Sequence, residues 1–263
     1  MKAKPYVGIT GPVDVVETKD VVNEFEAAGY NLNSPHLPMI GFLVSYKTLN
    51  GQIVENKRYP RITELERLLK ATEGKVFTTV HYNSSDRETL AEQVGRIFSG
   101  IYENNLCRGL QLNIPFPDLR EVEKIKKYFP EMQIIFQASR KVMEGKNPKQ
   151  IAAEIRDYDS LVNYVLIDPS GGKGELFDLN KSIEIYYALS DKCPEITVGF
   201  AGGFTGKNVL SRADYIVEKI KSRDFCIDAE GGLRDKLSER YGDDLLSIEK
   251  VIEFTQSASN VLR

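Results

Sequence analysis

Short apolar runs alternate with amphipathic stretches about eight times along the chain, and this alternation restricts the fold more than any other feature of the sequence. Runs rich in Val, Ile and Phe predict strands over 5–10, 37–44, 75–82, 108–114, 132–138, 161–168, 195–200 and 224–229. Helical periodicity predicts helices over 18–29, 62–72, 86–104, 118–129, 147–158, 180–191, 206–220 and 243–262. Strands separated by helices of this length form right-handed βαβ units and a parallel sheet.

The even spacing of these units favours a closed barrel. Eight units in 263 residues take about 33 residues each, which fits a (β/α)8 barrel of roughly 250 residues. A doubly wound open sheet is the alternative, but such a sheet rarely needs eight evenly spaced strands. No Pro/Ser-rich linker divides the chain. We therefore predict an α/β fold of a single TIM-barrel domain over 1–263, with eight parallel strands inside an outer ring of helices.

The composition and net charge of the chain limit the kinds of molecule that we expect it to bind. The chain is 41% hydrophobic and 28% charged, the balance of an ordinary globular protein. A net charge of −3 without a long basic run argues against nucleic acid, and no apolar run is long enough for a signal peptide or a membrane span. Three scattered cysteines and two histidines argue for a reducing compartment and against a zinc or multi-histidine site. We expect a cytoplasmic monomer or homodimer without metal or cofactor.

One polar segment interrupts the regular pattern. Residues 45–62 follow the second predicted strand, and Asn50-Gly51 within them is a typical hairpin turn. In a barrel, the loop after a strand lies on the face that carries the chemistry. We therefore expect this segment, folded as a hairpin, beside the active site.

The predicted strand ends carry the polar residues that a barrel uses for chemistry. In chain order they are Thr10-Gly11, Ser45, His81-Tyr82-Asn83, Asn113, Gln137, Asp168, Ala201-Gly202-Gly203 and Asp228-Ala229-Glu230-Gly231-Gly232. Glycine lets backbone N–H groups approach a ligand closely, and the loops after strands seven and eight often bind phosphate in this fold. We therefore predict a phosphate site at Gly202, Gly203, Gly231 and Gly232, with Gly172 after strand six. Tight turns are the alternative explanation.

Several of these stretches resemble one enzyme family. They are "PYVGIT", "IGFLVS" with "NKRYP", "QLN", "LIDPSGGKGELFDL", "GGFTGKNV" and "DAEGGLR". Together they resemble phosphoribosylanthranilate isomerase, the TIM barrel of the tryptophan pathway that catalyses an Amadori rearrangement. The resemblance implies a phosphorylated small-molecule substrate, an aldose–ketose type of isomerisation and no cofactor.

The resemblance also implies roles for single residues. It makes Asp168 the general acid that opens the sugar ring, and Arg58 the arginine that binds the substrate's carboxylate. It places the family's basic cysteine at Val7, so that a cysteine restored there is expected to raise the family activity. Asn113 replaces the family's histidine, and we assign Asn113 and Asp228 to substrate binding.

Two further residues are candidates for the missing base. Glu230 stands where the family has a serine of the phosphate loop. It could be a relocated base, a contact to a hydroxyl or amine of a different ligand, or a carboxylate paired with Arg234. His81 ends the third strand and is a second candidate base, although a lone histidine on a strand is more often a packed core residue.

Three functions remain open at this point. The first is an isomerase of a phosphorylated sugar or its conjugate. The second is another phosphosugar isomerase or epimerase on the same scaffold. The third is a catalytically silent barrel that binds a phosphorylated metabolite.

Overall fold

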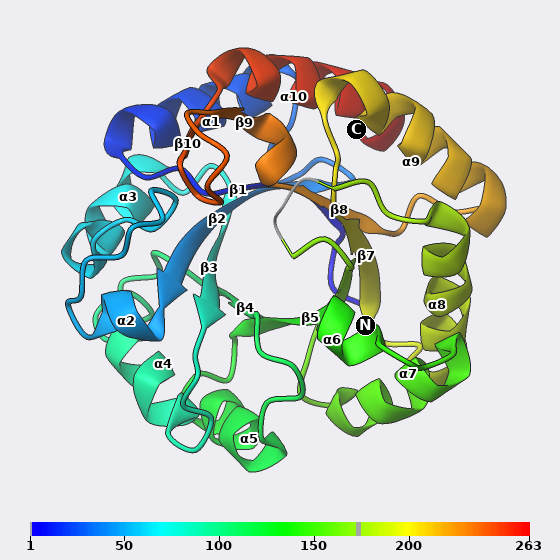
Figure 1. Ribbon diagram of the computed structural model, residues 1–263, viewed down its shortest axis with the longest axis horizontal. Coiled ribbons are helices and arrows are strands. Elements are labelled where there is room, and N and C mark those ends of the chain that lie inside the picture. The colour runs from blue at the N-terminus through cyan, green and yellow to red at the C-terminus, as the bar shows by residue number, and fades with distance from the viewer. Residues whose placement is uncertain (1, 172–174) are drawn as a thin grey trace.

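The chain folds into a closed barrel of eight parallel strands that follow one another in sequence order, with β8 pairing back onto β1. The computed structural model describes residues 2–171 and 175–263. The strands are β1 (Tyr6–Thr10), β2 (Leu37–Ser45), β3 (Phe77–Asn83), β4 (Gly109–Leu112), β5 (Gln133–Ser139), β6 (Tyr164–Asp168), β7 (Thr197–Ala201) and β8 (Cys226–Ala229). Figure 1 looks down the barrel, with the helices around it. The predicted (β/α)8 fold is confirmed.

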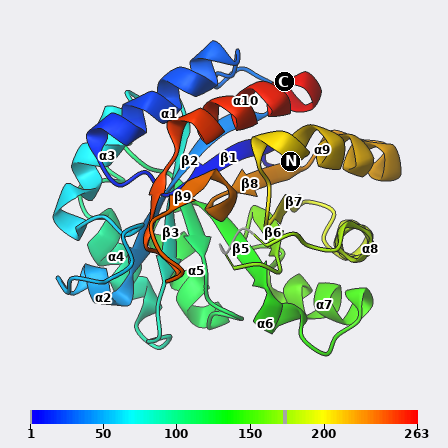
Figure 2. The same cartoon turned by 45° about the horizontal axis from the view of Figure 1, so that its top comes forward.

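Helices cover the outside of the barrel on all sides, as the tilted view in Figure 2 also shows. They are α1 (Val15–Ala27), α2 (Tyr46–Leu49), α3 (Leu65–Ala71), α4 (Leu90–Phe98), α5 (Leu119–Tyr128), α6 (Arg140–Met143), α7 (Pro148–Ile155), α8 (Leu179–Lys192), α9 (Gly206–Ile220) and α10 (Ile248–Leu262). Capping side chains determine where some of these helices begin. Asp14 caps α1 by accepting from the Glu17 N–H, and Asn147 caps α7 just before Pro148.

Strand alternation divides the apolar side chains between two cores. The larger core lies between the sheet and the helices, and its strand residues include Val7, Ile9, Leu110 and Leu112. The smaller core fills the barrel's interior below the C-terminal mouth, where Ala201 is its uppermost member, and consists of Tyr6, Met39, Ile135, Tyr164, Leu166, Ala201 and Cys226. Because this interior is packed, a ligand can enter the barrel only from the C-terminal end.

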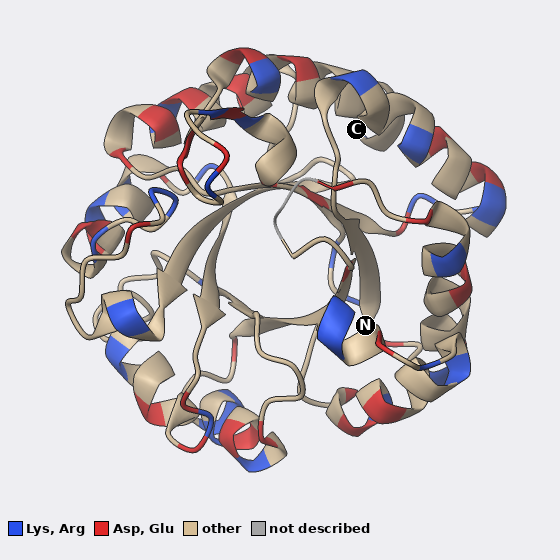
Figure 3. Cartoon of the chain, viewed as in Figure 1, with Lys and Arg blue, Asp and Glu red and all other residues tan. Residues whose placement is uncertain are grey.

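Charged residues are concentrated on the helices and loops, while the strands carry few (Figure 3). None of the helices in the described part of the chain is long and apolar enough to cross a membrane.

Two segments differ from the sequence prediction. The Asn50-Gly51 pair does not form a hairpin turn, because residues before it continue into the short helix α2 and Gly51 leaves that helix with φ of +75°. Residues 244–246 are not helical but form β10 (Asp244–Leu246), which pairs antiparallel with β9 (Arg234–Lys236). Burial alternates along β10, with Leu245 exposed and its two neighbours buried, which is the pattern of a strand.

Candidate functional site at the C-terminal mouth of the barrel

A cavity of about 290 Å³ lies at the C-terminal end of the barrel. Its lining residues come from the ends of strands and the loops that follow them. They are Leu43, Tyr59, Asn83, Gln111, Asn113, Gln137, Ser139, Asp168, Ser170, Gly171, Ala201, Gly202, Gly203, Asp228, Glu230, Gly231 and Tyr241. A concave, polar site at this end of the barrel is where the fold places its chemistry.

The structure brings most of the predicted site residues together in this cavity. Asp168, Asp228, Glu230, Asn113, Gly202, Gly203 and Gly231 all line it. His81, Arg58 and Gly232 do not line it. Gly172 lies outside the described residues.

Asp168 ends β6 with its carboxylate held by hydrogen bonds from neutral donors. Oδ1 accepts from the Ser170 N–H at 3.1 Å, the Ser170 hydroxyl at 2.9 Å and the Gly171 N–H at 3.0 Å. Among the described residues, Oδ2 accepts only from the Gln137 side-chain amide. A carboxylate oxygen has two lone pairs, so Oδ2 can still accept one proton or hydrogen bond from a ligand.

Asp228 lies one residue before the end of β8, in different surroundings. Burial, together with the negative charges of Glu230 and Asp168, raises its pKa well above the ordinary range. The Thr10 hydroxyl donates to Asp228 Oδ1 at 3.0 Å. The resemblance assigned the general acid to Asp168, whereas the structure gives Asp228 the surroundings of a carboxyl that holds its proton.

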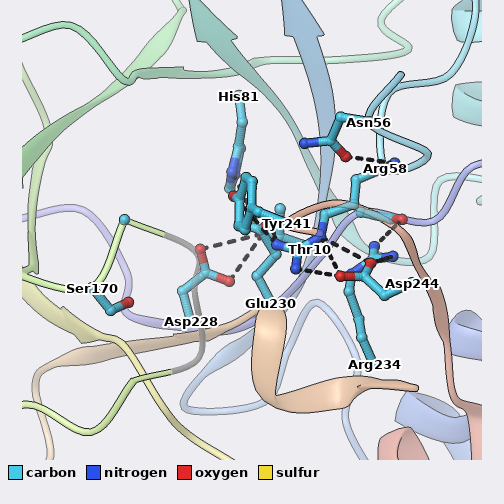
Figure 4. A network of polar contacts seen from close by, with 12 residues as sticks. Thr10, Asn56, Arg58, His81, Ser170, Asp228, Glu230, Arg234, Tyr241 and Asp244 are labelled. Carbon is cyan, nitrogen blue, oxygen red and sulfur yellow. Dashed lines mark hydrogen bonds and ion pairs between the residues drawn. The ribbon is translucent and has the colours of Figure 1, made fainter. Parts of the chain in front are cut away.

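His81 lies behind Thr10 rather than on the cavity wall (Figure 4). Its Nδ1 is 3.5 Å from the Thr10 hydroxyl, and its Nε2 packs close to the backbone of Gly41, where an added Cβ would come within 2.5 Å. Burial lowers the pKa of His81 to about 3. The side chain is therefore neutral near pH 7 and reaches the cavity only through Thr10 and Asp228.

Glu230 and Arg58 form a buried ion pair beside the cavity (Figure 4). Arg58 Nη1 donates to Glu230 Oε1 at 2.6 Å, and its Nε and Nη2 make a two-pronged contact with Asp244 at 3.0 and 2.6 Å. The Arg58 guanidinium also lies 4.6 Å from the centre of the Tyr241 ring. Arg58, predicted to bind substrate, is only 3% exposed and instead ties the loop after β2 to the loops after β8.

Arg234 completes this ion network from the other side. It donates to Asp244 Oδ1 at 3.3 Å and to the carbonyl oxygen of Gly11. Asp244 thus pairs with two arginines, and although burial acts in the opposite direction, the bonds to Arg58 keep its pKa below the usual value. Burial raises the pKa of Glu230 despite its pairing with Arg58. The pairing of Glu230 with Arg234 that the sequence suggested is replaced by a pairing with Arg58.

The glycine loops form one rim of the cavity, and close packing accounts for several of the glycines. Gly202 and Gly203 have φ of +106° and +67°, values that side chains rarely adopt. A Cβ on Gly203 would come within 2.8 Å of the Glu175 carbonyl oxygen, and one on Gly232 within 2.1 Å of the Phe204 carbonyl oxygen. Gly232 is therefore explained by packing alone, whereas Gly202, Gly203 and Gly231 also present backbone to the cavity.

Val7, which stands where the family that the sequence resembles has its basic cysteine, faces away from the cavity. Thr10 contacts Asp228 inside the barrel, and a Cβ on Gly8 would meet Met39 and Asp228 there. Successive side chains of a strand point to opposite faces, so Val7 points outward into the core beneath the helices, where it is fully buried. A cysteine at this position would not reach the cavity.

Sequence reasoning missed several lining residues. Gln111 and Ser139 lie on β4 and β5, and their inward direction follows from the register of the closed barrel. Tyr59 stands out in the sequence only as a neighbour of Arg58. Tyr241 lies in the connection between β9 and β10, and the only sequence signal for it was an aromatic residue within a charged loop. Among the described residues, no group of three or more His, Cys, Asp or Glu is arranged to hold a metal ion.

Comparison with known proteins identifies the fold. No protein-family model matches the chain, and no curated protein matches it. Among solved structures, N-(5'-phosphoribosyl)anthranilate isomerase from Pyrococcus furiosus superposes with a TM-score of 0.58 at 18% identity, covering 98% of this chain and 100% of that one. Phosphoribosylanthranilate isomerase from Thermotoga maritima gives 0.62 at 15% identity, covering 97% and 99%.

A third solved structure with a similar fold is a different protein. The alpha subunit of tryptophan synthase from Legionella pneumophila gives a TM-score of 0.59 at 9% identity, covering 98% of this chain and 92% of that one. At such identities the likeness concerns the fold, and this fold carries many chemistries. The barrel fold that the sequence resemblance implied is thus confirmed.

Proposed function

We propose that this protein is an enzyme that isomerises a phosphorylated sugar or a sugar conjugate by acid–base proton transfer. One observation carries the proposal: besides Glu230, which is paired with Arg58, the cavity is lined by two carboxyl groups, Asp168 and Asp228, whose surroundings differ. Pairs of titratable groups with unlike environments are the usual sign of an acid and a base that act together. We further propose that the protein works in the cytoplasm on a small molecule.

The surroundings of the two carboxyls assign their roles. Asp228, whose pKa is raised by burial, is the general acid, and it delivers a proton to the carbonyl oxygen of an open-chain sugar. Asp168, fixed by Ser170, Gly171 and Gln137, is the base, and its Oδ2 takes the proton from the carbon next to that carbonyl. One C–H bond breaks and one O–H bond forms, giving an enediol. Asp168 then returns its proton to the former carbonyl carbon while Asp228 takes the proton of the neighbouring hydroxyl, which completes the isomerisation and restores both groups.

The glycine rim supports a phosphate group on the substrate. Gly202, Gly203 and Gly231 line the same cavity as the two carboxyls. Helix α9 begins at Gly206, directly after this rim, and a helix N-terminus favours an anion. Glu230 would otherwise repel a phosphate, but its pairing with Arg58 offsets its charge. The phosphorylated substrates named for the phosphoribosylanthranilate isomerases of the same fold also favour this assignment.

Exchange of hydrogen with solvent tests the proposal whatever the product of the reaction is. The protein is incubated in D2O with ribose 5-phosphate, glucose 6-phosphate or phosphoribosylanthranilate, and loss of the proton next to the carbonyl is followed by NMR. We expect exchange with at least one of these sugars. Asp168→Asn and Asp228→Asn should each slow this exchange by about 10²–10⁴-fold, the usual loss when a positioned acid or base is removed.

A matched control uses the same substitution outside the cavity. Asp14 caps α1, and asparagine caps helices equally well, so Asp14→Asn should leave exchange unchanged. If all three sugar phosphates bind but none exchanges, the protein is the silent phosphometabolite binder that the sequence left open. Exchange that survives both Asp168→Asn and Asp228→Asn would reject the assigned roles.

A further inference from the structure

Resting on the proposed function, a further inference concerns the part of the substrate that faces β4, β5 and β6. Three residues on this side of the cavity carry groups that can accept a hydrogen bond from a ligand. They are the Gln111 side-chain oxygen, the Ser139 hydroxyl and the Asp168 carboxylate. We refer to them as the acceptor wall. We propose that the acceptor wall binds hydroxyl or amino groups of a sugar and excludes a carboxylate.

Gln111 supplies the first argument. The residue is 2% exposed, lines the cavity and donates its side-chain N–H to Asn113 Oδ1 at 2.9 Å. Its Oε1 is buried and has no hydrogen-bond partner among the described residues. A buried polar atom left unpaired costs about 1–3 kcal/mol, so such atoms are normally satisfied by a ligand or water. A donor on a ligand in the cavity would satisfy this oxygen.

Ser139 repeats the observation on the neighbouring strand. It ends β5, lines the same cavity, and its buried Oγ also has no partner among the described residues. A serine hydroxyl both donates and accepts, which suits a sugar hydroxyl. Two unpaired polar atoms on adjacent strands indicate a built subsite rather than a chance defect of packing.

The charges of the cavity supply the second argument. Asp168, Asp228 and Glu230 line it, while no lysine or arginine among the described residues does so. Glu230 is paired with Arg58, and Asp228 has a raised pKa, so Asp168 is the carboxylate that faces the cavity with only neutral hydrogen-bond donors among the described residues. An ammonium or hydroxyl group would be attracted there, whereas a second carboxylate would be repelled at short range.

Arg58 supplies the third argument. Its guanidinium is already bonded to Asp244 and Glu230 and does not line the cavity. The described residues thus offer no cation on the cavity wall to neutralise a carboxylate of the substrate. The substrate class that fits is a sugar phosphate with hydroxyl or amino groups and no acid group, rather than a carboxylated conjugate.

Binding measurements with three related sugars test this specificity. Glucosamine 1-phosphate, glucose 1-phosphate and glucuronic acid 1-phosphate share the ring and the phosphate but differ in carrying an amine, only hydroxyls or a carboxylate. Isothermal titration should give the tightest binding for the amine and the weakest for the carboxylate. We expect glucuronic acid 1-phosphate to bind at least about tenfold more weakly than glucosamine 1-phosphate, the effect of one charge-assisted contact.

A matched pair of variants locates the effect. Gln111→Met removes the unpaired oxygen at nearly constant size and should weaken binding of glucosamine 1-phosphate and glucose 1-phosphate by about tenfold. Gln133 also has a buried unpaired Oε1, but it begins β5 at the opposite end of the barrel. Gln133→Met should therefore leave all three affinities unchanged, and thermal melts of both variants verify that each is folded.

Three results would overturn the inference: equal affinity for the carboxylated sugar, unchanged binding in Gln111→Met, or no binding of any of the three sugars. The test is independent of turnover. Selective binding without hydrogen exchange would reject the proposed isomerase and keep the acceptor wall. Hydrogen exchange without selective binding would reject the acceptor wall and keep the proposed isomerase.

Discussion

At the scale of single residues, the protonation of Asp228 connects stability with function. A carboxyl near the end of an interior strand, close to Asp168 and Glu230, is unfavourable when ionised. Its folded-state pKa lies above its unfolded value, so its contribution to stability is complete below the unfolded pKa near 4 and is lost as pH rises through the folded pKa. The wild-type protein therefore loses stability between mildly acidic and neutral pH because of this group.

We predict that Asp228→Asn stabilises the protein while it abolishes proton transfer. Asparagine cannot ionise, so the gain in free energy of unfolding should be about 0.5–2 kcal/mol near neutral pH, the size that removal of an unfavourable group commonly gives. The gain should shrink toward pH 4, where Asp228 is protonated in both states. Urea unfolding of wild type and variant at pH 4.5, 6 and 8 measures it. A gain that does not change with pH would contradict the assignment of the raised pKa to Asp228.

At the scale of elements, the β9–β10 hairpin is held against the barrel by buried charges. Asp244 on β10 forms ion pairs with Arg58, which lies in the loop after β2, and with Arg234 on β9. The connection between the two strands packs closely as well, since Lys57 N–H donates to the Gly242 carbonyl oxygen at 2.8 Å and a Cβ on Gly242 would meet Asn56 within 2.3 Å. Tyr241, carried by this connection, reaches the cavity only because the hairpin is fixed there.

We predict that Asp244→Asn destabilises the protein strongly. Removing Asp244's charge takes the carboxylate partner from Arg234 and leaves Arg58 with Glu230, and breaking a buried ion network in this way typically costs about 3–5 kcal/mol. Urea unfolding provides the measurement, and the loss should persist in high salt because buried charges are poorly screened. Tyr241 should also become more accessible to iodination.

The neighbouring residue offers a matched control. Asp243 makes an ion pair with the half-exposed Lys57 at 2.8 Å and accepts a hydrogen bond from the Ser238 hydroxyl at 2.6 Å. Ion pairs that solvent reaches contribute little, so Asp243→Asn should cost much less than Asp244→Asn, about 1 kcal/mol or below. Equal losses for the two variants would show that the buried network is not what holds the hairpin.

At the scale of the whole molecule, the three cysteines report on how many cooperative units the chain has. Cys107 precedes β4, Cys193 follows α8 and Cys226 lies inside the barrel on β8, and all three are buried. Burial raises the pKa of Cys107 and that of Cys193 to about 11, so these thiols are unreactive near pH 8 in the folded protein.

We predict that the three thiols react with a labelling reagent only when the whole chain unfolds. Native-state labelling followed by peptide mass spectrometry should give three free energies of opening that agree with each other and with urea unfolding within about 1 kcal/mol, as one cooperative unit requires. A cysteine that reacts far faster than global unfolding would divide the chain into separate units. The prediction of one domain over 1–263 would then fail.

The repeating pattern of the chain was sufficient to predict the barrel. Each strand and its following helix leave a signal in the local sequence, because a buried strand needs an apolar run and an outer helix needs one apolar face. The pattern failed where tertiary contacts outweighed local preference. The helical pattern of α10 extends back over residues 244–246 without a break. These residues nevertheless form a strand, in which Asp244 pairs with Arg58 and Arg234.

The sequence by itself determined the fold, and it also identified the loops that surround the cavity, since strand order places all strand ends at one mouth. Only the tertiary structure decided which side chains face that cavity and whether they are protonated or paired with another charge. Arg58 is bonded to Asp244, Val7 points toward the helices, His81 lies behind Thr10, and burial raises the pKa of Asp228. The reason is physical: strand propensity is local, whereas the direction, burial and charge environment of a side chain depend on residues far away in the sequence.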